Sequence, residues 1–343
     1  MKSVSGGMPA QWLPLGVRVR NLAFRLSPSE ASFARHAFPG ASSPSRAHLE
    51  YIIETFISGF NAALDSSDDA ELTNQLDVSY PQPFLGFAYE GVGLWLAISD
   101  LFKPWTKVSR LASFTKNVAP HHDFIAMVGA GFAVARMPFG VRRLEAYQEK
   151  LDPFTAWCVA DGVGFHDGFF HWRKYQSGRQ QSPAYLNPQN RALFDAGVGR
   201  SFWWVYGAEP AAIAAAIGRF DAPRRAEMWT GVGTALAYAA GHQPGGEQLL
   251  LDLAGEHRVD LLAGIALGAN MRHKGGNPAP WTDDVCEKTL RRSVADVAGW
   301  VDADVADYLE SWDGVPRSMR EGCYLALRAR LDERLRQGER RSS

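Results

Sequence analysis

The chain has 343 residues, of which 46% are hydrophobic, and its 36 basic and 37 acidic side chains leave a net charge of −1. A chain of this length can bury a sizeable core, and its balanced charge argues against nucleic acid as a partner, because phosphate binding needs excess positive charge. The three cysteines, Cys158, Cys286 and Cys323, are odd in number and far apart. They favour buried thiols in a reducing cytoplasm over a disulfide framework.

The ends of the chain differ in composition from its middle. Residues 1–47 are rich in Ser, Pro and Gly and are predicted to form an irregular N-terminal arm. Arg18 and Arg20 interrupt any apolar signal region, and no stretch reaches the roughly 20 apolar residues that a membrane span needs. We therefore expect a cytoplasmic protein without a transmembrane segment. Residues 48–336 are predicted to form a single helical-repeat domain, and residues 337–343 a frayed tail.

A pair of small residues recurs along the middle of the chain, with first members 33 to 38 residues apart. The six pairs are Gly91/Gly93, Gly129/Gly131, Gly162/Gly164, Gly197/Gly199, Gly231/Gly233 and Gly264/Ala266. In five of the six a proline lies eight or nine residues earlier: Pro83, Pro120, Pro153, Pro188 and Pro223. Proline suits the first turn of a helix, so each unit is predicted to begin a long helix there and to carry its glycines where neighbouring backbones approach closely.

Shorter helical patterns separate the long ones, as at 141–151, 208–220 and 248–256. The pattern predicts an all-α fold of about six helical-pair repeats, each of about 34 residues. Such repeats form either an open α-solenoid or a compact α-α superhelical body. The sequence does not determine the curvature, and both arrangements remain open.

Four side chains break the pattern that the repeat sets, and His171 stands close to two of them. Glu90 and Asp161 stand one residue before a first glycine, while His166 and Asp167 stand four and five residues after one, where the other units mostly have apolar or small groups. His171 follows Asp167 by four residues, which places both on one helix face. Burying such groups is costly, and local violations of this kind mark functional sites. We take these five residues as candidate acid–base catalysts.

Aromatic side chains surround this run and predict an apolar ligand cavity in which Arg200 would hold an anionic end. The predicted lining residues are Tyr89, Phe165, Trp172, Arg200, Trp203 and Trp204. A purely structural alternative stands beside this: Asp167 and His171 as a surface pair, the aromatics as core, and Glu90 and Asp161 as acceptors at helix ends. The histidine spacing matches no established metal-ligand motif, and we expect neither a metal nor a cofactor.

Several runs resemble a bacterial family of unknown function whose members are encoded beside enediyne polyketide synthases. The similar runs are residues 86–91, 128–133, 161–172 and 197–201, and the run around His166 is the most specific. The resemblance extends from about residue 20 to residue 310. The resemblance implies a role in making or tailoring an enediyne core from a linear polyene. It does not identify catalytic residues in this chain.

Three interpretations follow. The leading one is an accessory protein that binds a linear polyene or polyketide intermediate in an aromatic helical cavity, with a cofactor-independent cyclase or isomerase activity as an open question. The alternative is a non-catalytic helical-repeat scaffold for the polyketide synthase and its companion proteins. A third is a metal-dependent oxidase that uses His166 and His171.

Overall fold

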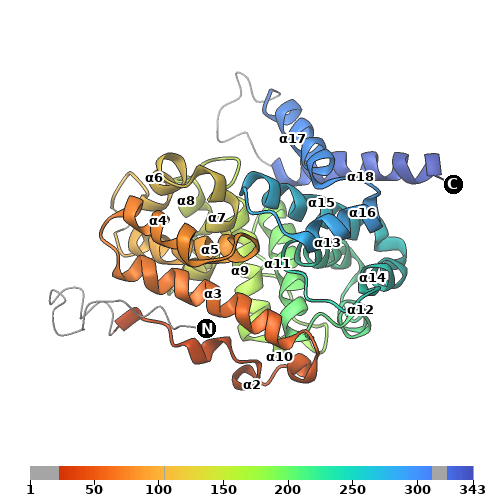
Figure 1. Ribbon diagram of the computed structural model, residues 1–343, viewed down its shortest axis with the longest axis horizontal. Helices are drawn as coiled ribbons and strands as arrows, with labels where there is room; N and C mark the ends of the chain where they lie inside the picture. Colours follow the sequence, from red (N-terminus) through yellow and green to blue (C-terminus); the bar gives the residue numbers. More distant parts are fainter. Residues whose placement is uncertain (1–22, 104, 311–322, 343) are drawn as a thin grey trace.

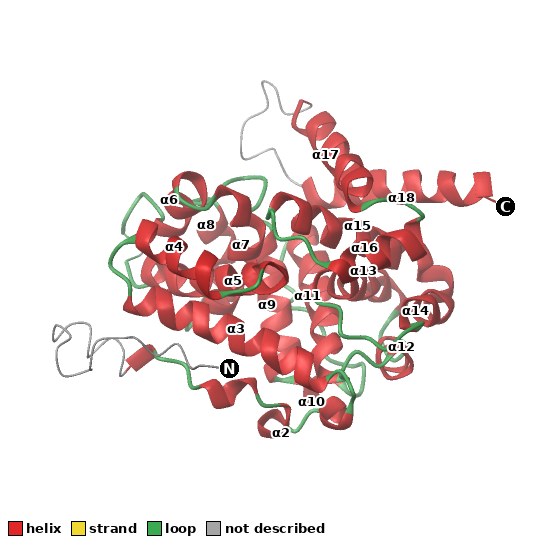
Figure 2. Ribbon diagram, in the orientation of Figure 1, coloured by secondary structure: helices red, strands yellow, loops and turns green. Residues whose placement is uncertain are grey.

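The computed structural model describes residues 23–103, 105–310 and 323–342, and every regular element within these ranges is a helix (Figures 1 and 2). The predicted all-α fold is confirmed. Seven helices stack in chain order, each packing against the next. They are α3 (Arg46–Asp65), α5 (Gln82–Leu101), α7 (Asp123–Arg136), α9 (Cys158–Phe170), α11 (Pro188–Val205), α13 (Ala222–Tyr238) and α15 (Arg258–Lys274).

Shorter helices connect the stacked ones, as the repeat predicted, and longer ones follow at the C-terminal end (Figure 1). The connecting helices are α4 (Asp69–Ser79), α6 (Arg110–Asn117), α8 (Leu144–Gln148), α10 (Trp172–Tyr175), α12 (Pro210–Ile217) and α14 (Gly246–Ala254), and α16 (Pro280–Leu290) comes directly after α15. Helix α2 (Phe33–His36) and the 3-10 turn η2 (Pro28–Ala31) precede the stack, and α17 (Val294–Glu310) and α18 (Cys323–Ser342) follow it. Helix α18 continues beyond Arg336, so residues 337–342 are helical.

The paired glycines explain why the helices can lie so close together. A Cβ atom at Gly129 would overlap the carbonyl oxygen of Glu90 in the preceding helix, and one at Gly93 would overlap the carbonyl oxygen of Ala126 in the following helix. Each first glycine therefore faces backward along the stack and each second glycine faces forward. The predicted close backbone approach is confirmed, and it allows weak Cα–H···O contacts between helices.

Helix α3 is a further member of the repeat that the sequence pattern did not include. A Cβ atom at Gly59 would overlap the carbonyl oxygen of Ala88, and one at Gly91 would overlap that of Phe56. These are the same relative positions that the later helices use. The unit was missed because Ile57 stands where the others have their first glycine and because no proline precedes it at the usual distance.

The prolines begin helices in only part of the repeat. Pro83, Pro188 and Pro223 lie in the first turn of α5, α11 and α13, as predicted. The prediction is wrong for Pro120, which lies in a 3-10 turn before α7, and for Pro153, which precedes the start of α9 by five residues. Asp152 accepts hydrogen bonds from the backbone N–H groups of residues 154 and 155, which fixes a separate turn ahead of α9.

The stack curls until its early helices meet its late ones. The Arg272 side chain, only 1% exposed, donates hydrogen bonds to the carbonyl oxygens of Tyr238 and of Pro83, the latter at 2.6 Å. The His48 ring donates to the carbonyl oxygen of Ala239 at 2.7 Å. These contacts join α3 and α5 to the ends of α13 and α15, so the body is a closed superhelix rather than an open solenoid.

Helix α5 is long and apolar enough to cross a membrane by length and composition alone, contrary to the expectation from the sequence. The apolar window of this helix is 78% buried inside the protein. It packs between α3 and α7. Burial against two neighbours accounts for its composition, as for the core helix of a globular body.

Candidate functional site

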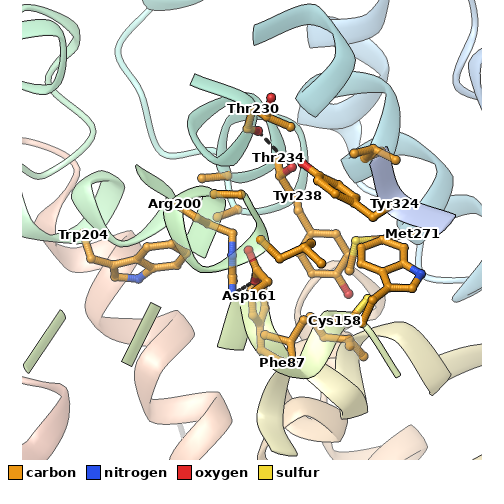
Figure 3. Close-up of a pocket in the computed structure, with 18 residues that line it drawn as sticks. Phe87, Cys158, Asp161, Arg200, Trp204, Thr230, Thr234, Tyr238, Met271 and Tyr324 are labelled. Carbon is orange, nitrogen blue, oxygen red and sulfur yellow. Dashed lines mark hydrogen bonds and ion pairs between the residues drawn. The ribbon is translucent and has the colours of Figure 1, made fainter. Parts of the chain in front are cut away.

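Two cavities lie inside the closed stack and share the side chains of Phe87, Arg200 and Trp204. The first, which we call the aromatic cavity, has a volume of about 230 Å³. Its wall includes the aromatic side chains Phe56, Phe132, Phe165, Phe169 and Phe170. The second, the inner chamber, has a volume of about 60 Å³ and lies among α5, α7, α9, α11, α13, α15 and α18 (Figure 3).

The repeat itself determines which side chains face these cavities. Glu90 and Asp161 stand one residue before a first glycine, Phe165 and Arg200 stand three residues after one, and Trp204 stands seven residues after one. These positions are four residues apart, so they form one stripe along a helix. Because each helix packs on the next through its glycines, the same stripe faces inward in every unit.

An ion pair stands at the wall between the two cavities. The Arg200 guanidinium lies 2.5 Å from the Asp161 carboxylate, and both side chains are largely buried. Figure 3 shows the two side chains meeting between α11 and α9. Burial raises the pKa of Asp161, and the nearby Arg200 cation opposes that shift. The pair therefore provides a fixed cation and a fixed anion in an otherwise apolar interior.

Glu90 adds a second carboxyl group that lines the aromatic cavity. Within the described residues its carboxylate has no hydrogen-bond partner. Burial raises the pKa of Glu90 to about 7; the Arg200 charge opposes this shift and the Asp161 charge adds to it. A carboxyl group that titrates near neutrality can both accept and donate a proton, which is the property a general acid–base catalyst needs.

His166 lies at the edge of the aromatic cavity and contacts a residue that lines it. The Arg136 Nε–H donates to His166 Nε2 at 3.2 Å, and the guanidinium lies 4.9 Å from the centre of the Phe170 ring. Burial, the Arg136 charge and the His171 ring together lower the pKa of His166 to about 3. His166 is therefore neutral at physiological pH and acts as a hydrogen-bond acceptor, not as a proton donor.

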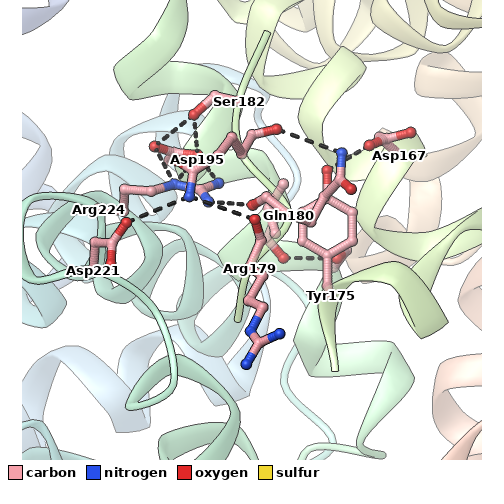
Figure 4. Close-up of polar contacts among 11 residues, drawn as sticks. Asp167, Tyr175, Arg179, Gln180, Ser182, Asp195, Asp221 and Arg224 are labelled. Carbon is pink, nitrogen blue, oxygen red and sulfur yellow. Dashed lines mark hydrogen bonds and ion pairs between the residues drawn. The ribbon is translucent and has the colours of Figure 1, made fainter. Parts of the chain in front are cut away.

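Asp167 and His171 lie away from both cavities. His171 Nδ1 donates to the Asp167 carboxylate at 2.7 Å. The His171 side chain is 43% exposed and the Asp167 side chain is 28% exposed. The Tyr175 hydroxyl donates to the same carboxylate. Figure 4 places Asp167 and Tyr175 near the buried ion pair between Asp195 and Arg224. The predicted catalytic set is thus divided: Glu90 and Asp161 face the interior, His166 borders it, and this pair belongs to an outer polar network.

Half of the predicted lining residues face a cavity. Phe165, Arg200 and Trp204 do. Tyr89, Trp172 and Trp203 line neither cavity, because each is held elsewhere. Tyr89 stacks on His122 at 3.9 Å between ring centres, and the indole N–H groups of Trp172 and Trp203 donate to the carbonyl oxygens of His36 and Ala240.

Some cavity residues were missed by reasoning from the sequence. Arg136 and Tyr238 stand seven residues after a first glycine, as Trp204 does, and Phe132 stands three residues after one. A comparison of the units at these two positions would have found them. The positions four and five residues after the glycine, where the polar residues stood out, lie on another face of the helix.

The described part of the chain contains no cluster of three or more His, Cys, Asp or Glu side chains placed to hold a metal ion. The centres of the His166 and His171 rings are 6.2 Å apart, their planes are inclined at 70°, and the two rings are already hydrogen-bonded to Arg136 and Asp167 respectively. The oxidase interpretation therefore has no ligand set in these residues.

The chain matches a protein-family model over most of its length. A family described as a protein of unknown function (DUF1702) matches residues 16–334. The chain belongs to the DUF1702 family. Neither the curated proteins nor the solved structures contain a match to it. Because the family assignment names no activity, a function for this DUF1702 protein has to be argued from its cavities.

Proposed function

We propose that this DUF1702 protein is an accessory protein of enediyne polyketide biosynthesis that binds an elongated, unsaturated intermediate in the aromatic cavity and moves a proton on it through Glu90. The observation that carries the proposal is a buried carboxyl group with a pKa of about 7 in an aromatic wall, beside the Arg200–Asp161 ion pair. The pathway named in the proposal comes from the resemblance to a family encoded beside enediyne polyketide synthases.

The aromatic lining of the cavity suits a linear polyene. Such a ligand is flat, rigid and apolar, and it packs well against the faces and edges of aromatic rings. The ring centre of Phe165 lies 5.4 Å from that of Phe132. It also lies 5.6 Å from the ring centre of Phe169 and 5.1 Å from that of Trp204. These rings form a continuous apolar wall from α7 to α11.

The chemistry we propose is a proton-transfer isomerisation. The Glu90 carboxylate removes a proton from a carbon beside a conjugated carbonyl group, and the electron pair moves into the conjugated system. Arg200 stabilises the negative charge that develops on the ligand oxygen. The Glu90 carboxylic acid then returns the proton to another carbon, so that a double bond moves without net oxidation or reduction.

A host that makes the enediyne product but lacks the native gene tests this proposal. Wild-type protein should restore the product, whereas Glu90→Gln should leave a linear polyene that still binds the protein. Asp167→Asn serves as the matched control, since that carboxylate lies in the outer polar network. Full product formation by Glu90→Gln would contradict the proposed role of Glu90.

One surface feature favours the scaffold as a second candidate. Phe102, Trp105 and Val108 follow one another along the connection between α5 and α6, and Trp105 is 76% exposed. Exposed apolar groups of this kind are typical of protein contacts. A scaffold should retain the polyketide synthase on co-purification, lose it in Trp105→Ser, and support product formation with Glu90→Gln.

A further inference from the structure

An arginine at the entrance of the aromatic cavity forms no ion pair within the described part of the chain. Arg136, at the C-terminal end of α7, lines the cavity and is exposed to solvent. Its guanidinium lies over the Phe170 ring, and its Nε–H is bonded to His166. Among the described residues no carboxylate lies within ion-pair distance of it.

The nearest candidate anion is already engaged. Glu30 lines the same entrance, but its carboxylate pairs with Arg35 at 2.6 Å. Glu30 is still near enough to favour the charged form of Arg136. The terminal N–H groups of Arg136, however, donate no hydrogen bond to any described residue. A guanidinium in this state is suited to bind a carboxylate with two parallel hydrogen bonds.

We propose that Arg136 binds the carboxylate of a free linear polyene acid whose chain runs inward along the phenylalanine wall and carries a second, conjugated carbonyl group near Glu90 and Arg200, and that His166 is the positioning residue for Arg136. This inference rests on the proposed function and specifies its substrate class. This orientation agrees with the exposure of the two polar ends of the cavity, because Arg136 is exposed and Glu90 is buried. The charged end of the ligand stays hydrated while its apolar chain is buried.

His166 can orient Arg136 because it accepts a hydrogen bond at Nε2, which places the ring proton on Nδ1. Fixing Nε in this way turns the planar guanidinium so that its other N–H groups remain available. The corresponding residues in the neighbouring units, such as Ala133 and Ser201, are too short to make this contact. The inference therefore gives His166 a role other than acid–base catalysis.

Binding of α-parinaric acid, a fluorescent linear tetraene acid, and of its methyl ester tests the inference at pH 8. Wild-type protein should bind the acid at least about tenfold more tightly than the ester, as expected for one charge-assisted contact. Arg136→Met should bring the ratio close to one, and Arg136→Lys should restore only part of it. Arg173→Met is the matched control, because Arg173 also lies over an aromatic ring, that of Trp172 at 4.7 Å, and lines neither cavity. It should keep the wild-type ratio.

The His166 variants separate positioning from a structural role. His166→Gln, which keeps an acceptor, should retain most of the preference for the acid, whereas His166→Leu should lower it while ester binding is unchanged. Equal binding of acid and ester by wild-type protein would overturn the inference and leave the proposed function standing, as expected for a ligand delivered as a thioester. Failure of wild-type protein to bind either compound would overturn both.

Discussion

Arg200 lies between an anion and an aromatic face that come from the same helix. Its guanidinium is 2.5 Å from the Asp161 carboxylate and 4.5 Å from the centre of the Phe165 ring, and both partners belong to α9. Asp161 and Phe165 are four residues apart, so together they hold the arginine on the inward face of the stack. The cation thus has a fixed position at the wall that the two cavities share.

Losing one member of the Asp161–Arg200 pair should destabilise the fold, and losing the second as well should add little to that loss. Asp161→Asn and Arg200→Met should each lower the free energy of unfolding by about 3–5 kcal/mol, because each leaves a buried charge without its partner. The double variant should lose much less than the sum of the two. Urea unfolding of the four proteins measures the coupling, and additive losses would show that the two side chains do not interact.

Glu90 should make stability depend on pH. The pKa of Glu90 in the folded protein, about 7, is above the ordinary value of 4.5, so the folded state holds the proton more tightly than the unfolded state does. The stability that this proton contributes is fully present below pH 4.5 and is lost as pH rises through 7. Between these two values the loss amounts to about 1.4 kcal/mol for each pH unit.

Glu90→Gln should therefore be relatively more stable than wild-type protein at pH 8 than at pH 5. Thermal unfolding of both proteins across this range measures the difference. Glu54→Gln is the control, since Glu54 is exposed on the neighbouring helix α3. Parallel curves for wild-type protein and Glu90→Gln would contradict the raised pKa.

The glycines of the stack should be sensitive to a single methyl group. Gly231→Ala would place a Cβ atom against the carbonyl oxygen of Ala196 and force α11 and α13 apart, at a cost of about 3 kcal/mol or more. Gly299→Ala in α17 meets no neighbouring atom and should stabilise that helix by up to about 1 kcal/mol. Denaturant unfolding compares them, and equal effects would mean that the glycines do not set the helix spacing.

Arg272 should hold the superhelix closed. Arg272→Met removes the charged hydrogen bonds to the carbonyl oxygens of Pro83 and Tyr238, of which the Tyr238 oxygen keeps only the weaker bond from the Trp281 indole, and this loss should cost about 3 kcal/mol or more. Hydrogen exchange should rise at the start of α5 and the end of α13. The control is Arg292→Met, an exposed arginine over the Trp300 ring, which should change neither property.

The sequence revealed the stack because its packing requirement is local. Each close approach needs a glycine at a fixed place, so the requirement repeats visibly at Gly129, Gly162 and Gly197. The closure through Arg272 was not predictable. It depends on the curvature accumulated over the whole stack, which no short pattern encodes.

The site was predicted in part for a similar reason. Glu90 and Asp161 were found because they stand one residue before a first glycine, where other units have apolar or small groups, and Arg200 was named as a group that would hold an anionic ligand end. Asp167 stands out equally in the sequence, but it lies six residues after Asp161. At about 100° per residue this places it about 120° around the helix, which explains its outer position. The unexpected polar residues showed which repeat unit differs from the others. The helix face on which each residue lies determines whether it reaches the cavity.

The most direct test of the proposed function is mass spectrometry of small molecules extracted from the protein after co-expression with an enediyne polyketide synthase. We predict a highly unsaturated linear acid that is bound to the wild-type protein and absent from Ile53→Trp, in which a larger side chain fills the aromatic cavity. An empty wild-type protein that retains the synthase would contradict ligand binding and favour the scaffold.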